Sequence, residues 1–125
     1  MGTKIKLQVG NTSLRAELND SRAAWELAGK LPLRVRMSRW GDEYYGSCGL
    51  REALGPEARE KMEVGELAAW PPGNALCVFF GPTPAGSGPE PRAASPVNPI
   101  GRLTGDPSPL KGMGGTITVE LSLDK

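Results

Sequence analysis

Residues 66–80 read Glu-Leu-Ala-Ala-Trp-Pro-Pro-Gly-Asn-Ala-Leu-Cys-Val-Phe-Phe, two short apolar runs separated by four turn-forming residues. Each run has the length of a strand, and a Pro-Pro-Gly-Asn segment between them is typical of a turn. No polar residue interrupts the sequence from Cys77 to Phe80, which is typical of a strand buried on both faces. The stretch therefore predicts two strands, Glu66–Trp70 and Ala75–Phe80, the second of them inside the core.

Further strands are expected on both sides of this pair. Alternating polar and apolar residues predict strands with one face on the core and the other in water. The expected strands are Lys4–Val9, Leu14–Leu18, Leu33–Met37, Val97–Leu103 and Thr116–Leu121. Turn-forming residues at positions 10–13 join the first two into a hairpin. The chain is therefore expected to be mostly β.

One main helix is expected after the hairpin. Asn19-Asp20-Ser21 offers an N-cap, and Gly29 can end the helix. Between them, small and apolar residues recur at helical spacing: Ala23, Ala24, Leu27 and Ala28. Pro56 suits the first position of a helix, so a short second helix is expected there.

The composition points to one domain with a long loop. A chain of 125 residues is the size of one ordinary domain, and its 17 glycines and 12 prolines suit a β-fold with many turns. Residues 82–96 are rich in Pro, Gly and Ser and nearly devoid of large hydrophobic side chains. Such a segment buries too little surface to order itself, so it is expected to be a mobile loop within a single domain, 1–125.

Charge and residue usage exclude several classes of function. The net charge of +1 gives no field that would attract nucleic acid or an anionic membrane, and no apolar run is long enough to span a bilayer. The chain contains no histidine, which excludes Ser-His-Asp catalysis and His-ligated zinc. We expect no metal and no cofactor, a cytoplasmic location, and free thiols at Cys48 and Cys77.

Three stretches, in this order, carry a resemblance to a known fold: Trp40-Gly41-Asp42-Glu43-Tyr44, Phe79-Phe80-Gly81-Pro82-Thr83-Pro84 and Ile100-Gly101-Arg102. On these marks the chain resembles a compact bacterial and archaeal family of cyclophilin-like proteins of unassigned function. The resemblance implies a closed β-barrel of about eight strands, with one main helix over an open end.

The likeness to true cyclophilins suggests candidate site residues. Met37-Ser38-Arg39-Trp40-Gly41-Asp42 is similar to the cyclophilin Met-x-Gln-Gly-Gly-Asp stretch, with Arg39 in place of the glutamine that contacts substrate. Trp70 ends a segment similar to the strand beside the proline pocket, and Phe80 matches the pocket phenylalanine. The segment that supplies the catalytic arginine is not reproduced, and the tryptophan and histidine that close the proline pocket have no counterpart. The resemblance thus implies substrate-binding roles for four residues: Met37, Arg39, Trp70 and Phe80.

Prolyl isomerisation needs a dry pocket and a cationic donor, because the barrier of about 20 kcal/mol comes from lost amide resonance. Arg34 and Arg36 are the candidate catalytic donors. The same two arginines also fit a half-exposed strand, and Phe80 and Met37 also fit a core. Asp42 and Glu43 are sequential and would point to opposite faces of a strand, so a turn is preferred to an acid–base pair.

Three functions remain open. The first is a module that binds a proline-containing peptide or another small ligand, with weak or absent isomerase activity. The second is an atypical but active peptidyl-prolyl isomerase. The third is a structural or subunit-pairing domain, in which exposed aromatic side chains such as Trp40 and Tyr45 would contact another copy in a homo-oligomer.

Overall fold

The structure is a computed structural model that describes residues 2–124. These residues form nine strands, one α-helix and two 3-10 helices. The strands are β1 (Thr3–Val9), β2 (Thr12–Leu18), β3 (Leu33–Arg39), β4 (Glu43–Ser47), β5 (Arg59–Lys61), β6 (Glu66–Trp70), β7 (Ala75–Phe79), β8 (Arg92–Leu103) and β9 (Thr116–Leu123). The helices are α1 (Arg22–Ala28), η1 (Pro71–Gly73) and η2 (Ser108–Gly112). No helix in this part of the chain is long and apolar enough to cross a membrane.

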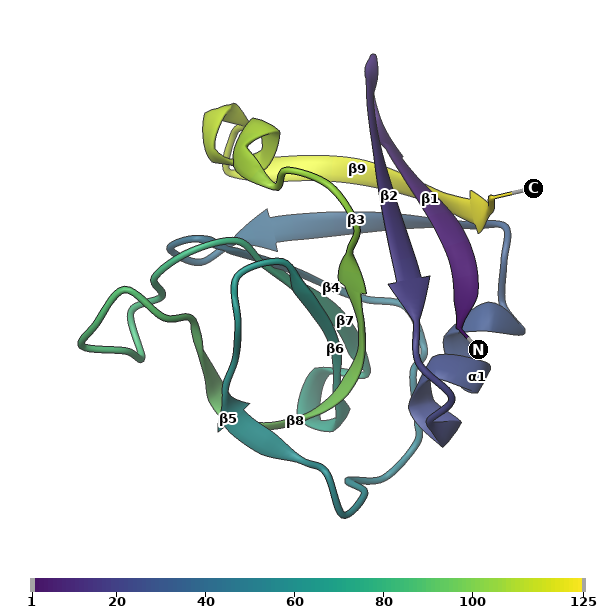
Figure 1. The fold of residues 1–125 in the computed structure, drawn as a ribbon, viewed down its shortest axis with the longest axis horizontal. Coiled ribbons are helices and arrows are strands. Elements are labelled where there is room, and N and C mark those ends of the chain that lie inside the picture. Colours follow the sequence, from purple (N-terminus) through teal and green to yellow (C-terminus); the bar gives the residue numbers. More distant parts are fainter. Residues whose placement is uncertain (1, 125) are drawn as a thin grey trace.

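Eight of the described strands close into an antiparallel barrel (Figure 1). Their order is β2-β1-β9-β3-β4-β7-β6-β8, and pairing of β8 with β2 joins the two ends of the sheet. At the closure Gly101 of β8 lies between Leu18 of β2 and Leu67 of β6. The predicted mostly β, closed barrel is therefore confirmed.

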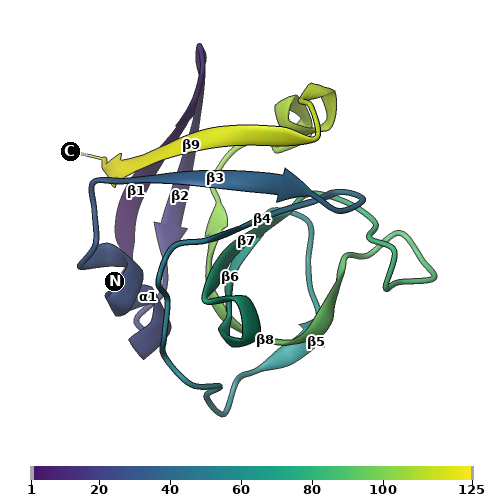
Figure 2. The same ribbon diagram turned by 180° about the vertical axis from the view of Figure 1, so that it is seen from behind.

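The N-terminal hairpin and α1 form as the sequence predicts. Ser21 is the N-cap of α1, its hydroxyl accepting a hydrogen bond from the amide of Ala24, and Gly29 is the C-cap. Figures 1 and 2 show α1 beside the ends of β1 and β2. Because Ala23, Ala24 and Leu27 join the main core, α1 closes this end of the barrel.

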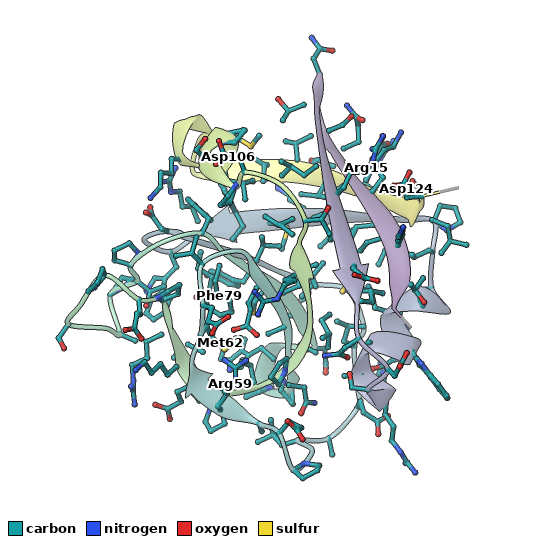
Figure 3. All side chains as sticks on the ribbon, in the orientation of Figure 1. Arg15, Arg59, Met62, Phe79, Asp106 and Asp124 are labelled. Carbon is teal, nitrogen blue, oxygen red and sulfur yellow. The ribbon has the colours of Figure 1, made fainter. Side chains whose placement is uncertain are left out.

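Two hydrophobic clusters lie on opposite faces of β7. Inward-facing Leu76 and Val78 belong to the main core inside the barrel. Cys77 and Phe79 face outward, where they pack in a second cluster with Met62, Ala68, Ala93 and Val97. Figure 3 labels Phe79 and Met62 of this cluster. All five residues of β7 are buried, which confirms the prediction of a strand with neither face exposed to solvent.

The segment that packs over the outer face of β7 is the first half of β8, and its start differs from the prediction. Residues 92–96 were expected to lie in the loop, but β8 begins at Arg92, and its first half pairs with β5. Only residues 80–91 separate β7 from β8, and Figure 1 shows part of this segment projecting from the barrel. The sequence signal was missed because β5 has only three residues, too few to show a period.

The short helix expected at Pro56 does not form. Residues 56 and 57 make a turn, in which the amide of Ala58 donates to the carbonyl of Gly55. The chain then extends at once into β5, because Arg59 pairs with Val97 of β8. The short helices of the described chain lie elsewhere, as η1 and η2.

Candidate functional site

Two of the predicted substrate-binding residues lie inside the barrel. Met37 is 0% exposed and Phe80 is 1% exposed, and both belong to the main core. The ring of Phe80 stacks on Tyr44 with a distance of 5.5 Å between ring centroids. On the outside of the barrel it is Phe79, rather than Phe80, that packs against the outer face of the sheet.

The two candidate catalytic arginines lie on the outer face of β3. Arg34 is exposed and forms an ion pair with Glu120 of β9, with Nη2 2.6 Å from the carboxylate. Arg36 is also exposed and pairs across the sheet with Thr118. Both therefore lie on the β3–β9 part of the barrel surface, as expected for polar residues of a half-exposed strand.

Arg39 is bonded into a network at one end of the barrel. Its guanidinium donates to Asp42 Oδ1 at 2.9 Å and to the carbonyls of Lys111 and Met113, and lies 5.0 Å from the centroid of the Phe80 ring. The other carboxylate oxygen of Asp42 accepts from Lys111 Nζ at 2.7 Å. Burial would raise the pKa of Asp42, but the hydrogen bonds from Lys111 and Arg39 outweigh it and lower that pKa. Arg39 thus holds the β3–β4 turn against η2.

The first two family stretches meet in this turn. Gly41 has a φ of +62°, and a Cβ there would lie 2.7 Å from Cδ of Pro84. The amide of Asp42 donates to the carbonyl of Pro82, and a Cβ on Gly81 would lie 2.3 Å from Asp42 Oδ2. Glycine is therefore required at positions 41 and 81, because the β3–β4 turn packs closely against the segment that follows β7.

A pocket of about 290 Å³ lies on the outer face of the barrel, between β4 and the first half of β8. Its lining residues are Trp40, Glu43, Tyr45, Trp70, Cys77, Ala93, Ala94 and Val97. Tyr45 of β4 pairs with Cys77 of β7, which places both on one row of the sheet. The indole Nε1 of Trp70 donates to Ser95 Oγ at 2.7 Å and so fixes the position of that ring. Of the six predicted site residues, Trp70 is the one that lines this pocket.

Glu43 is the one charged residue among the described residues that line the pocket. It is 5% exposed, and among residues 2–124 its Oε1 is the one buried side-chain oxygen or nitrogen without a hydrogen-bond partner. Burial raises the pKa of Glu43 from 4.5 to about 7, although a hydrogen bond with the Cys77 thiol acts in the opposite direction. Burial and the neighbouring Glu43 raise the pKa of Cys77 well above its usual range, so this thiol stays protonated.

The sequence did contain a signal for Glu43. A strand that is buried on both faces needs a further segment of the chain packed against its outer face. The outward-facing residues of the neighbouring strand then lie beside that segment. Glu43 pairs with Phe79 in this position. The interpretation of Asp42 and Glu43 as a turn is right for Asp42, which lies between β3 and β4. It is wrong for Glu43, which begins β4 and lines the pocket.

The cysteines and carboxylates do not form a metal site in the described chain. Cys48 and Cys77 are free thiols, as predicted. Within residues 2–124, no group of three Cys, Asp or Glu side chains is placed to hold a metal ion.

Fold and pocket together define a closed eight-stranded β-barrel with a small, aromatic-walled pocket on its outer surface. The family model described as cyclophilin-like matches residues 3–122, and the chain belongs to this cyclophilin-like family. The solution structure of the hypothetical protein AF2241 from Archaeoglobus fulgidus is similar to this chain, with a TM-score of 0.80 and 29% sequence identity. That similarity covers 98% of this chain and 95% of the other. No curated protein matches the chain.

Proposed function

We propose that this protein binds a small ligand in the pocket on the outer face of the barrel and has weak or absent prolyl isomerase activity. One observation carries the proposal: Glu43, whose buried Oε1 has no hydrogen-bond partner among the described residues, lines a mostly apolar pocket of about 290 Å³. Buried polar atoms normally have a hydrogen-bond partner, and an exception in a pocket indicates a place where a ligand can supply one. A cavity of about 150 Å³ already holds a benzene ring, so this pocket has room for a somewhat larger molecule.

The positions of the arginines argue against efficient isomerisation. None of the described residues that line the pocket is an arginine or lysine. Arg34 is paired with Glu120, and Arg39 is committed to Asp42. An enzyme that stabilises a twisted prolyl amide needs a donor placed in advance beside the bound ring, and loss of such a donor typically costs about 100-fold to 1,000-fold in rate.

We therefore expect the turnover of a short Xaa-Pro peptide to be at least about 100-fold below that of a typical cyclophilin. A protease-coupled isomerisation assay with a cyclophilin as positive control measures this directly. Arg36→Ala is the comparison variant, because Arg36 is exposed and its removal leaves the core intact. Rapid wild-type turnover that this substitution abolishes would support an active isomerase in place of a binding protein.

Binding in the pocket is tested by blocking its mouth. Ala94 lines the pocket and is exposed, so Ala94→Phe fills space there without entering the core. With benzyl alcohol as a small aromatic probe, we expect NMR shifts of the Trp40 and Trp70 indole N–H signals in the wild type and their loss in Ala94→Phe. Ala85→Phe, at an exposed position outside the pocket, is the matched control. Trp25 is 65% exposed on α1 and serves as an internal reference signal.

The proposal fails if the probe shifts Trp25 as much as the pocket indoles. It fails equally if Ala94→Phe leaves the shifts of Trp40 and Trp70 unchanged, because binding would then lie elsewhere.

A further inference from the structure

We propose that the pocket selects a small organic ligand that carries a protonated amine, with the Glu43 carboxylate as acceptor of its N–H group. This inference rests on the proposed function, since it names the chemical class of the ligand for the same pocket. It is carried by the charge, the burial and the surroundings of Glu43, compared with a second buried carboxylate on the same sheet.

The comparison is with Glu66, at the start of β6. Glu43 and Glu66 are 5% and 4% exposed, and they lie on the two strands that flank β7. Glu66 is fully satisfied: Arg59 donates to both carboxylate oxygens, at 2.9 Å and 2.6 Å, and the amide of Glu63 donates at 2.8 Å. A buried carboxylate on this face is therefore stable where a cation lies against it.

Glu43 has no such cation among the described residues, although the preceding residue, Asp42, binds two. Arg39 and Lys111 are both bonded to Asp42, with N–O distances of 2.9 Å and 2.7 Å. The other residues that line the pocket are Cys77, which hydrogen-bonds to Glu43, three aromatic residues and the apolar side chains of β8. Among the described residues, Glu43 thus has no counterpart of the Arg59 that pairs with Glu66, and it lines the pocket.

The walls of the pocket also favour a cation. Trp40, Tyr45 and Trp70 contribute three aromatic rings to a space with one acidic residue. The faces of aromatic rings attract cations, and tryptophan does so most strongly. An ammonium group bound here would have the Glu43 carboxylate and aromatic rings as neighbours, and its apolar body would contact Ala93, Ala94 and Val97.

A metal ion fits this site less well than an amine. A hard cation such as Mg²⁺ or Ca²⁺ needs several oxygen ligands, and Glu43 is the one carboxylate among the described lining residues. An ammonium group needs one strong acceptor and tolerates apolar surroundings on its carbon side. The chemistry of the pocket therefore corresponds to an organic ammonium ion.

The experiment compares benzylamine with benzyl alcohol, which has a similar shape but no charge. Both are titrated at about pH 8, where the amine is still protonated, into the wild type and into Glu43→Gln. We expect benzylamine to bind the wild type about 10-fold to 100-fold more tightly than benzyl alcohol, the usual advantage of a charge-assisted hydrogen bond. Glu43→Gln should reduce this preference to about one, since glutamine keeps the shape but removes the charge.

The outcomes separate this inference from the proposed function. Equal affinities of the two probes for the wild type, both lost in Ala94→Phe, would overturn the amine selectivity and leave the pocket as a binding site. Absence of binding by either probe would overturn both. A preference for benzylamine that persists in Glu43→Gln would also overturn the assigned role of Glu43.

The same ammonium group occurs in free amines and in the lysine side chain. A third titration with Nα-acetyl-lysine methylamide distinguishes these two sources. Tighter binding than benzylamine assigns a lysine side chain as the ligand group, and weaker binding assigns a free amine.

Discussion

Replacement of Gly101 by alanine is expected to lower the free energy of unfolding by about 3 kcal/mol. Gly101 lies where β8 pairs with β2 and closes the barrel. A Cβ at this position would lie 2.3 Å from the carbonyl oxygen of Glu17 and 2.9 Å from Cα of Leu18. Both are backbone atoms of β2, so the contact is relieved only if β2 moves away from β8. The substitution thus weakens the pairing that joins the two ends of the sheet.

The measurement is urea unfolding followed by circular dichroism, with Gly105→Ala as control. Apart from Gly105 itself and its two chain neighbours, no atom of the described chain lies within 4 Å of a Cβ built on Gly105. Alanine there should change the stability by less than about 1 kcal/mol, since it mainly restricts the unfolded chain. Equal effects of the two substitutions would show that close approach at Gly101 does not determine barrel closure.

Gly101 illustrates how far the sequence predicts this fold. Alternation and apolar runs predicted six strands, because each has either a polar–apolar alternation or an apolar run of strand length in its own sequence. These strands are β1, β2, β3, β6, β7 and β9. The Ile100-Gly101-Arg102 stretch marked the family, but its physical reason is the close approach of Glu17, a residue far away in the sequence. Contacts of this kind depend on which strands become neighbours, which local patterns do not specify.

The first half of β8 was missed for a related reason. Residues 92–96 contain small residues and a proline, and alone they resemble a loop. They become a strand because β5 supplies hydrogen-bond partners and because Ala93 joins Met62 and Phe79 in the outer cluster. Tertiary pairing therefore decides the conformation of a segment whose own propensity for a strand is weak.

The site was harder to predict than the fold because the register of β7 was ambiguous. Alternation requires Phe79 and Phe80 to face opposite sides, but both faces of β7 are apolar, so no polar residue marks the outside. The structure places Phe80 in the main core and Phe79 under β8. A shift of one position moves the expected pocket from one face of the sheet to the other, and it explains why Phe80 lies away from the pocket.

The pH dependence of stability tests the state of the Glu43 carboxyl. Burial raises its pKa in the folded protein from 4.5 to about 7, so the folded state favours the protonated form. Below about pH 4 the carboxyl is protonated in both states and Glu43 has no net effect. As the pH rises towards 7, only the unfolded state releases the proton, and the stability falls. Above about pH 7 the full destabilisation is reached, about 3 kcal/mol for a shift of this size.

Glu43→Gln removes this titration while keeping the shape of the side chain. We expect the variant to match the wild type at about pH 4 and to exceed its free energy of unfolding by about 3 kcal/mol at about pH 8. Urea unfolding of both proteins across this range gives the difference. Hydrogen bonds lower the pKa of Asp42 in both proteins, and its contribution therefore cancels.

The matched control is Glu66→Gln, on the other side of β7. Glu66 holds Arg59 in an ion pair, with Nη2 2.6 Å from Oε2, so removal of its charge leaves a guanidinium without its partner. This variant should lose about 1 to 3 kcal/mol of stability at about pH 8, the opposite sign from Glu43→Gln. Two carboxyls of similar burial on one sheet would then respond oppositely, because Glu66 is paired with a cation of the chain and Glu43, among the described residues, is not. A difference between wild type and Glu43→Gln that does not change with pH would contradict a raised pKa of Glu43, because it would show that this pKa is the same in the folded and unfolded protein. An advantage of Glu43→Gln that shrinks as the pH rises would show that a partner already stabilises the ionised carboxylate.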